Sequence, residues 1–206
     1  MRYILYFLLF GINCFSQEFE GKIMYKISYL PNQNVVIDTT ELKKSLGSKM
    51  EFTVADGKFK EITDSDFLTY KLYLPAENRL YFQERTAPDK LFYYRGDKTA
   101  NTPFEYKIVK KAEKILGYDC DKLVYKNDKY EMTFYYAPKL KMNPDHCKHF
   151  TFTNKNKISK LMSAVFLKHT IVTKDFIATM EAVEVIPMKV DESEFAKPEN
   201  LTIEEQ

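Results

Sequence analysis

The stretch Phe19–Tyr29 (FEGKIMYKISY) decides the fold class, because its character alternates from one residue to the next. Its odd-numbered positions hold Phe, Gly, Ile and Tyr, whereas most of its even-numbered positions are charged or polar. Successive side chains of a β-strand point to opposite faces of the sheet. The stretch therefore predicts a strand that buries one face and exposes the other.

Turn signals separate further strands of this kind. Asp56-Gly57 is favoured in a type I′ turn, because both central residues of that turn have a positive φ. It predicts a hairpin between Met50–Ala55 and Phe59–Ile62. The remaining expected strands are Phe67–Leu74, Leu80–Gln83, Leu91–Tyr94, Lys122–Tyr125, Tyr130–Tyr136, Leu161–Val172 and Phe176–Ile186. The Asn127-Asp128 turn is expected to separate the fourth and fifth of these.

One amphipathic helix is expected between the first two strands. Asp38 with Glu41 resembles a capping box, Leu42 and Leu46 form an i, i+4 stripe, and Gly47 ends the helix. Pro138–Lys160 is expected to be a long connection, and Gly117 before Tyr118 suggests a bulge or a close backbone approach. Together these signals predict a mainly β (α+β) fold: a curved antiparallel sheet or half-open β-barrel with one or two helices packed against it.

The N-terminus has the organisation of a cleavable signal peptide. Arg2 precedes the apolar run Tyr3–Ile12, which is too short for a membrane-spanning helix. Small residues at Cys14 and Ser16 predict cleavage before Gln17, leaving 17–206 as a single β-rich domain that is exported to the periplasm. Lipidation of Cys14 is the alternative, and Asn13 disfavours it because Gly or Ala is expected there.

The composition excludes several classes of function. The formal net charge is +2, so the chain has no broad basic face of the kind that binds nucleic acid. No second apolar run is long enough to span a membrane after cleavage. With 15 Tyr, 16 Phe and no Trp, the chain instead favours strands with large aromatic surfaces.

No motif for catalysis or for cofactor binding stands out. The glycines are scattered, so phosphate-binding loops are absent, and there is neither a G-x-S-x-G nor an H-E-x-x-H motif. The carboxylate pairs Asp64/Asp66 and Asp119/Asp121 lie beside turns or among polar residues, where solvated acids are common. We therefore expect a non-enzymatic protein without a cofactor.

Cys120 and Cys147 are the two cysteines that remain after cleavage. An even number in an oxidising compartment predicts a disulfide, with two buried thiols as the alternative. A second use of Cys147 is a metal site with His146 and His149, whose types are those of zinc ligands. The tight spacing of these three residues disfavours that site, so we expect no metal.

The expected connection is locally basic. It contains a single acid, Asp145, and six lysines: Lys139, Lys141, Lys148, Lys155, Lys157 and Lys160. Lysines beside an apolar entrance attract anionic lipid head groups, although an ordinary solvated loop has the same composition.

Four segments resemble a known family. Ile115–Lys122 (ILGYDCDK) is similar to the I-x-G-Y-x-C-x-K run of small exported Gram-negative proteins of unknown function allied to the GLPGLI group. Phe19–Tyr25, Tyr135–Leu140 and Phe195–Pro198 resemble further segments of the same family. The resemblance implies a fold like that of LolA, the periplasmic lipoprotein carrier, in which a half-open barrel with a helical lid encloses an apolar cavity.

On this basis we expect a binding or carrier protein for a lipid, an acyl chain or another apolar ligand of the cell envelope. Strands that are apolar on both faces suit the wall of such a barrel. The residues expected to line the cavity are Tyr25, Ile27, Phe52, Leu72, Phe82, Tyr94, Tyr125 and Phe134. The alternative is an envelope interaction or assembly module that binds a protein partner through exposed strand edges. A metal-dependent enzyme built on His146, Cys147 and His149 is a third and weaker reading.

Overall fold

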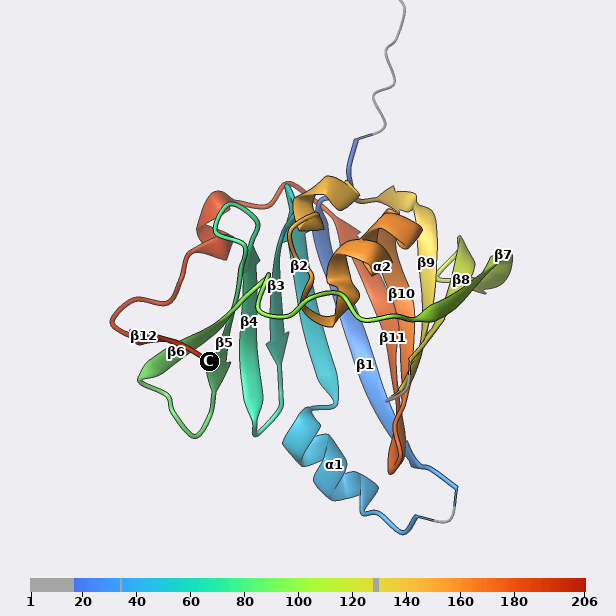
Figure 1. Cartoon of the computed structure of the whole chain (residues 1–206), viewed down its shortest axis with the longest axis horizontal. Helices are drawn as coiled ribbons and strands as arrows, with labels where there is room; N and C mark the ends of the chain where they lie inside the picture. Colours follow the sequence, from blue (N-terminus) through green and yellow to red (C-terminus); the bar gives the residue numbers. More distant parts are fainter. Residues whose placement is uncertain (1–16, 34, 128–129) are drawn as a thin grey trace, which may run out of the picture.

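The computed structural model describes residues 17–33, 35–127 and 130–206 (Figure 1). The predicted signal peptide and Cys14 lie outside these residues, as does Asp128 of the predicted Asn127-Asp128 turn. The strands are β1 (Gly21–Pro31), β2 (Lys49–Ala55), β3 (Lys58–Thr63), β4 (Leu68–Leu74), β5 (Arg79–Glu84), β6 (Lys90–Arg95), β7 (Glu105–Ile115), β8 (Tyr118–Lys126), β9 (Glu131–Lys141), β10 (Ala164–Val172), β11 (Phe176–Pro187) and β12 (Thr202–Glu205). The helices are α1 (Thr39–Leu46) and α2 (Lys155–Met162), with short 3-10 turns η1 (Pro144–Cys147), η2 (Phe152–Asn154) and η3 (Glu192–Phe195).

All twelve strands form one open sheet in the order β12-β6-β5-β4-β3-β2-β1-β11-β10-β9-β8-β7. Every pairing is antiparallel except that of β12 with β6. Figure 1 shows the sheet curving around α2, with α1 at one end of the strands. The predicted fold class, a curved and mainly antiparallel sheet with one or two helices, is confirmed.

The opening stretch forms β1, at the centre of the sheet. Ile23 and Tyr25 are 0% and 2% exposed, and the burial of β1 alternates along its length as the sequence pattern predicts. β2 and β11 flank this strand, with Ile23 opposite Phe52 on one side and Val185 on the other. β1 therefore joins two meanders, β1–β6 and β7–β11, into one sheet.

The two strongest local signals are confirmed. The carboxylate of Asp38 accepts hydrogen bonds from the backbone N–H groups of Thr40 and Glu41 at the start of α1. Asp56 and Gly57 have φ of 48° and 74°, as a type I′ turn between β2 and β3 requires.

The region around Gly117 differs from the expectation of a bulge. Leu116 and Gly117, with φ of 49° and 83°, form a tight turn between β7 and β8. β7 is not predicted by its sequence, because this strand lies at the sheet edge and most of its residues are exposed, so it has no regular apolar face.

The expectation of a long connection over Pro138–Lys160 is wrong. β9 continues to Lys141, and η1, η2 and α2 occupy most of the rest. The predicted strand Leu161–Val172 consequently begins later, at Ala164, because its first residues complete α2. Ile158 and Met162 of α2 pack on the concave face of the sheet, beside Tyr125 and Phe134.

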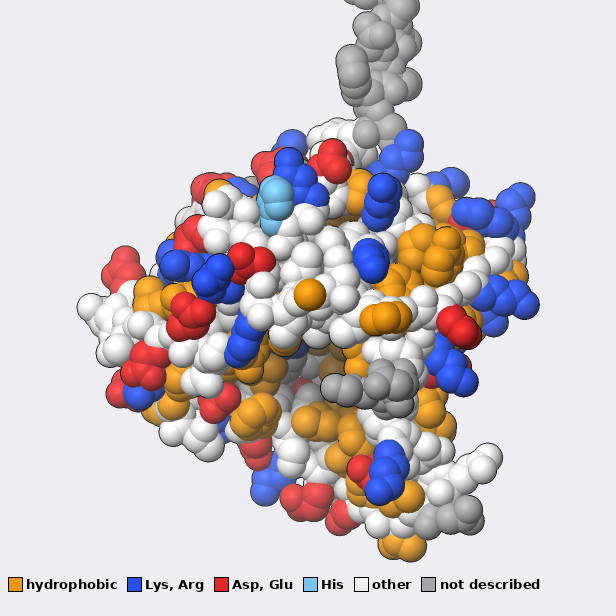
Figure 2. Space-filling model, in the orientation of Figure 1, with side chains coloured by type: hydrophobic (Ala, Val, Ile, Leu, Met, Phe, Trp, Pro, Cys, Tyr) orange, Lys and Arg blue, Asp and Glu red, His pale blue; other side chains and the backbone are white. Residues whose placement is uncertain are grey.

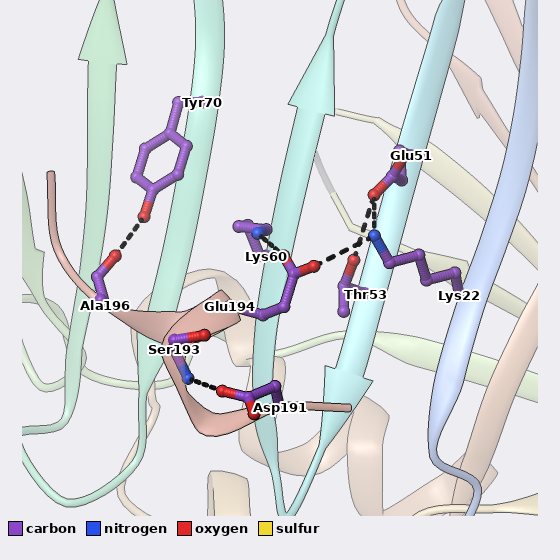
Figure 3. Close-up of polar contacts among 9 residues, drawn as sticks. All are labelled: Lys22, Glu51, Thr53, Lys60, Tyr70, Asp191, Ser193, Glu194 and Ala196. Carbon is purple, nitrogen blue, oxygen red and sulfur yellow. Dashed lines mark hydrogen bonds and ion pairs between the residues drawn. The ribbon is translucent and has the colours of Figure 1, made fainter. Parts of the chain in front are cut away.

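The C-terminal segment crosses the convex face. Phe195 of η3 is buried there against Leu72, Tyr81 and Leu91. Figure 3 shows the polar contacts around it: Glu194 forms ion pairs with Lys60 on β3 and Lys22 on β1. This segment packs against the convex face of the sheet through both apolar and ionic contacts.

In the described part of the chain, no helix is long and apolar enough to cross a membrane.

Candidate functional site

The concave face of the sheet carries most of the residues expected to line a cavity. Register across the strands places Phe52, Phe82 and Phe134 on this face, together with Tyr25, Ile27, Tyr94 and Tyr125. Leu72 is the exception, and its expected role as a lining residue is wrong. Its neighbour Lys71 faces the concave side, so Leu72 faces the convex side and packs under Phe195.

The half of the concave face beneath α2 is filled. A cavity of about 30 Å³ lies there among the described residues, between Phe52 and Phe59 of the sheet and Lys155 and Met162 of α2. One buried water needs roughly 10–15 Å³ of such space, so this cavity is too small for an acyl chain. Aromatic side chains close it, with Phe166 centred 5.5 Å from Tyr25 and 6.5 Å from Phe52.

The half of the concave face nearer α1 is open. The loop of residues 96–104, which we call the crossing loop, runs from β6 to β7 across the front of the sheet (Figure 1). Figure 2 shows a hollow between this loop and α1, with hydrophobic side chains around much of its rim. The cleft, as we call this hollow, lies in front of the central strands.

A buried amide holds the crossing loop in place. Asn154, which is 2% exposed, accepts a hydrogen bond from the backbone N–H of Thr102 and donates to the hydroxyl groups of Thr102 and Tyr125. The backbone N–H of Phe152 also donates to the carbonyl of Gly96. The loop is thus attached to η2 at the lower edge of the helical cover.

Polar side chains project into this aromatic face from both walls. On one wall, Glu61 of β3 lies beside Lys71 of β4, with 2.9 Å between the carboxylate Oε2 and the ammonium Nζ. Glu61 is opposite Phe52 in the β2–β3 register, and its side chain is only 18% exposed. Lys155, at the start of α2, places its Nζ 5.3 Å from the centre of the Phe59 ring.

On the other wall, His169 of β10 stacks on Phe134, with ring centres 4.3 Å apart and planes 2° apart. Its Nε2 atom is buried and has no hydrogen-bond partner within the described residues. The His169 side chain as a whole is only partly buried. A buried polar atom without a partner is unusual in a folded protein, so Nε2 requires an explanation.

The electrostatics couple the two walls. Burial raises the pKa of Glu61, but the charges of Lys71 and Lys155 outweigh this, and the pKa lies below its usual value. Burial, together with Lys155 and Lys71, lowers the pKa of His169 to about 4. At neutral pH the four side chains therefore comprise two cations, one anion and a neutral imidazole.

The predicted disulfide is not formed in this structure. Cys120 and Cys147 are both free thiols, buried in the main hydrophobic core. Cys120 on β8 instead directs its Sγ to the carbonyl of Tyr118, at 3.6 Å, and burial raises the pKa of its thiol.

The predicted alternative of a metal site is not supported either. Nε2 of His146 lies 3.2 Å from Glu18, Cys147 is buried and His149 is exposed. Across residues 17–33, 35–127 and 130–206, no three His, Cys, Asp or Glu side chains are arranged to hold a metal ion.

The carboxylate pairs singled out in the sequence have structural contacts. Asp64 accepts hydrogen bonds from the backbone N–H groups of Ser48 and Lys49, which fixes the end of α1 against β2. Asp121 accepts from the backbone N–H of Lys111 and forms an ion pair with Lys110.

Glu61, Lys71 and His169 are not among the residues predicted from the sequence. A signal was present at Glu61, because Phe59 fixes which positions of β3 face inward. By that alternation Glu61 occupies an inward position, while the apolar Ile62 is outward and 43% exposed. This inversion of the usual pattern marks a polar group on an apolar face.

Comparison with known proteins supports the fold alone. No family profile and no curated protein sequence matches this chain. Two crystal forms of PNGF-II are similar in structure, with TM-scores of 0.54 and 0.50 and 16% sequence identity in both. These matches cover 91% and 89% of this chain, which spans about a third (32% and 31%) of the length of the PNGF-II chains.

A domain from Vibrio parahaemolyticus, described as an outer membrane lipoprotein-sorting protein domain, matches with a TM-score of 0.26 and 10% identity. The match covers 85% of this chain and 89% of that domain. The likeness is too weak to support an argument.

Proposed function

We propose that this protein is a non-enzymatic binding or carrier protein for an apolar ligand of the cell envelope, such as an acyl chain, held in the cleft on the concave face. The observation that carries the proposal is the cleft itself. It is a hollow with hydrophobic side chains around much of its rim, which α2 and the crossing loop leave open (Figure 2). Small-molecule sites are typically concave and mostly apolar, with a few convergent polar groups, and this cleft has all three properties.

The family resemblance of the sequence supports the same proposal. The segments Phe19–Tyr25 and Ile115–Lys122, on which that resemblance rests, lie in β1 and across the β7–β8 turn. The related carriers implied by the resemblance work outside the cytoplasm, which agrees with the expected export signal.

Two measurements test the proposal. Mass spectrometry of the purified protein under non-denaturing conditions should detect a co-purifying lipid, and a fluorescent alkyl probe should bind with displacement by added lipid. Protein that carries no lipid and takes up no alkyl probe would contradict the binding function.

A matched pair of variants locates the site. Met180 is partly buried and is opposite His169 in the β10–β11 register, so Met180→Trp should fill the cleft and reduce probe binding at least tenfold. Val183 lies on the same strand and is 56% exposed, so Val183→Trp should leave binding unchanged. Equal effects from the two variants would place the ligand elsewhere.

The alternative, a protein-interaction module, would use the exposed edge strand β7. Tyr106 is 56% exposed there, which favours a contact surface. However, the strand carries Lys107, Lys110, Lys111 and Lys114 and its register shifts between Val109 and Glu113, and both features discourage pairing with another strand. We therefore favour the cleft.

A further inference from the structure

We propose that the cleft binds a single-chain amphiphile with a carboxylate head group, and that the carboxylate is held by Lys155, Lys71 and the Nε2 atom of His169. This inference rests on the binding function proposed above and adds the chemical class of the ligand. Three features of the site carry it. They are an excess of positive charge, a hydrogen-bond donor without a partner among the described residues, and apolar side chains beside these polar groups.

The excess charge is the first feature. Glu61 offsets one of the two cations, and its ion pair is with Lys71. Lys155 has no ion-pair partner among the described residues; its Nζ instead lies over the Phe59 ring. Lys155 is partly buried, and a cation that is partly withdrawn from water is stabilised by an accompanying anion. An anionic ligand would supply that charge and would bring the four side chains and the ligand to neutrality.

The imidazole is the second feature. Its stacking on Phe134 fixes the plane of the ring, and with it the plane in which Nε2 can donate. A neutral histidine carries one N–H, and the tautomer with the proton on Nε2 is a hydrogen-bond donor. Since no described residue accepts from that atom, a ligand oxygen is the group that would satisfy it. A carboxylate has two oxygens and can accept from the imidazole and from an ammonium group at once.

The walls supply the third feature. Ile27 and Met180 continue the row of His169 across β11 and β1, and Phe82 continues the row of Glu61 and Lys71 onto β5. An alkyl chain that leaves the head group therefore meets apolar side chains in either direction along the sheet. The site has one net positive charge, so a monoanion such as a carboxylate matches it better than the dianion of a phosphate monoester.

The test compares three ligands with the same chain, which are dodecanoate, dodecanol and dodecyl phosphate, by isothermal titration calorimetry at neutral pH. We expect dodecanoate to bind about tenfold more tightly than dodecanol, as a charge-assisted hydrogen bond predicts. Tighter binding of dodecyl phosphate than of dodecanoate would overturn the carboxylate assignment. Equal binding of dodecanoate and dodecanol would also overturn it while leaving the binding function intact, whereas no binding of any of the three would refute the binding function.

Variants with opposite expected effects separate the head-group contact from a loss of folding. Lys155→Gln should weaken dodecanoate binding about tenfold and leave dodecanol binding unchanged. Glu61→Gln removes the competing carboxylate and should strengthen dodecanoate binding several-fold. Lys160→Gln is the matched control, since it removes the same charge from an exposed position of α2. If Lys160→Gln weakens binding as much as Lys155→Gln does, the effect is long-range electrostatics and the proposed contact is wrong.

Discussion

Lys60 and Glu61 are neighbours on β3, yet they belong to two regions with opposite properties. Lys60 faces the convex side, where it forms an ion pair with Glu194 of the C-terminal segment (Figure 3). Glu61 faces the concave side, in a cluster that retains an excess of positive charge and an unpartnered Nε2 of His169. β3 thus separates a polar region whose charged groups all have partners within the protein from a polar region in which some groups have none among the described residues.

This difference shows which charged residues stabilise the fold. On the convex face, Lys22, Lys60, Glu51 and Glu194 form a connected set of ion pairs beside the buried Phe195. Such a network orients a segment that the protein itself provides. On the concave face the polar groups lack a complete set of partners, as expected where a ligand supplies the remainder. Convex substitutions should therefore change stability alone, and concave substitutions should change binding.

The largest expected effect is that of Phe195→Ala. Removal of this buried ring should lower the free energy of unfolding by about 3–5 kcal/mol, because it leaves a cavity over Leu72, Tyr81 and Leu91. Urea denaturation measures the change, and Phe67→Ala, at a site that is 50% exposed, is the control. Loss of alkyl-probe binding by folded Phe195→Ala protein would break the division between the two faces.

The next effect is a pH dependence from the concave face. The folded pKa of His169 is about 4 against an ordinary value of 6.5, so between these pH values the unfolded chain binds a proton that the folded protein does not. Stability should therefore fall as the pH decreases from 6.5 to 4, by on the order of 2–3 kcal/mol from this group. Below the folded pKa the contribution should become constant.

His169→Gln should flatten this part of the profile of unfolding free energy against pH, measured in urea at several pH values. His149→Gln, at an exposed site, is the control. A profile that His169→Gln leaves unchanged would show that the ring is not held in its neutral form.

A smaller effect is expected from the convex ion pairs. Glu194 is 35% exposed, so Glu194→Gln should lower stability by about 1 kcal/mol at low salt. The double variant with Lys60→Met should recover part of this, because it also removes the buried ammonium that would otherwise lack its partner. Dodecanoate affinity should be the same in the unsubstituted protein, in Glu194→Gln and in the double variant, and a change would mean that the two faces are coupled.

No effect at all is expected from a reducing agent. Because Cys120 and Cys147 are free, the thermal midpoint should be the same with and without reductant. A disulfide closing the chain between them would add about 3–4 kcal/mol, so a clear drop on reduction would restore the pairing predicted from the sequence.

Features with local causes were predictable from the sequence. The alternation of β1, the Asp56-Gly57 turn and the Asp38 cap each depend on a few neighbouring residues, and each is confirmed. α2 was missed because its stability comes from distant contacts. It follows two residues with positive φ, Thr153 and Asn154, and has no capping side chain.

The candidate site shows the same limit. Phe52 and Phe134 face the concave side, but Leu72, in a strand that is apolar on both faces, does not, because the sequence of such a strand does not fix which face is inward. The electrostatic coupling between Glu61 and His169 could not be foreseen. These residues are far apart in sequence, and the curvature of the whole sheet brings their two walls together.

The central position of β1 also sets an order of assembly. Within the two meanders, neighbouring strands follow one another in sequence, so those pairings close short loops. The joint between the meanders pairs Gly21 with Pro187 and Pro31 with Phe176, near opposite ends of the described chain. Contacts at such large sequence separation form slowly, so we expect the β1–β11 seam to form last and to limit the folding rate. Until β1 pairs with β11, the two walls of the cleft do not face each other. The ability to bind a ligand should therefore appear in the final kinetic phase of folding.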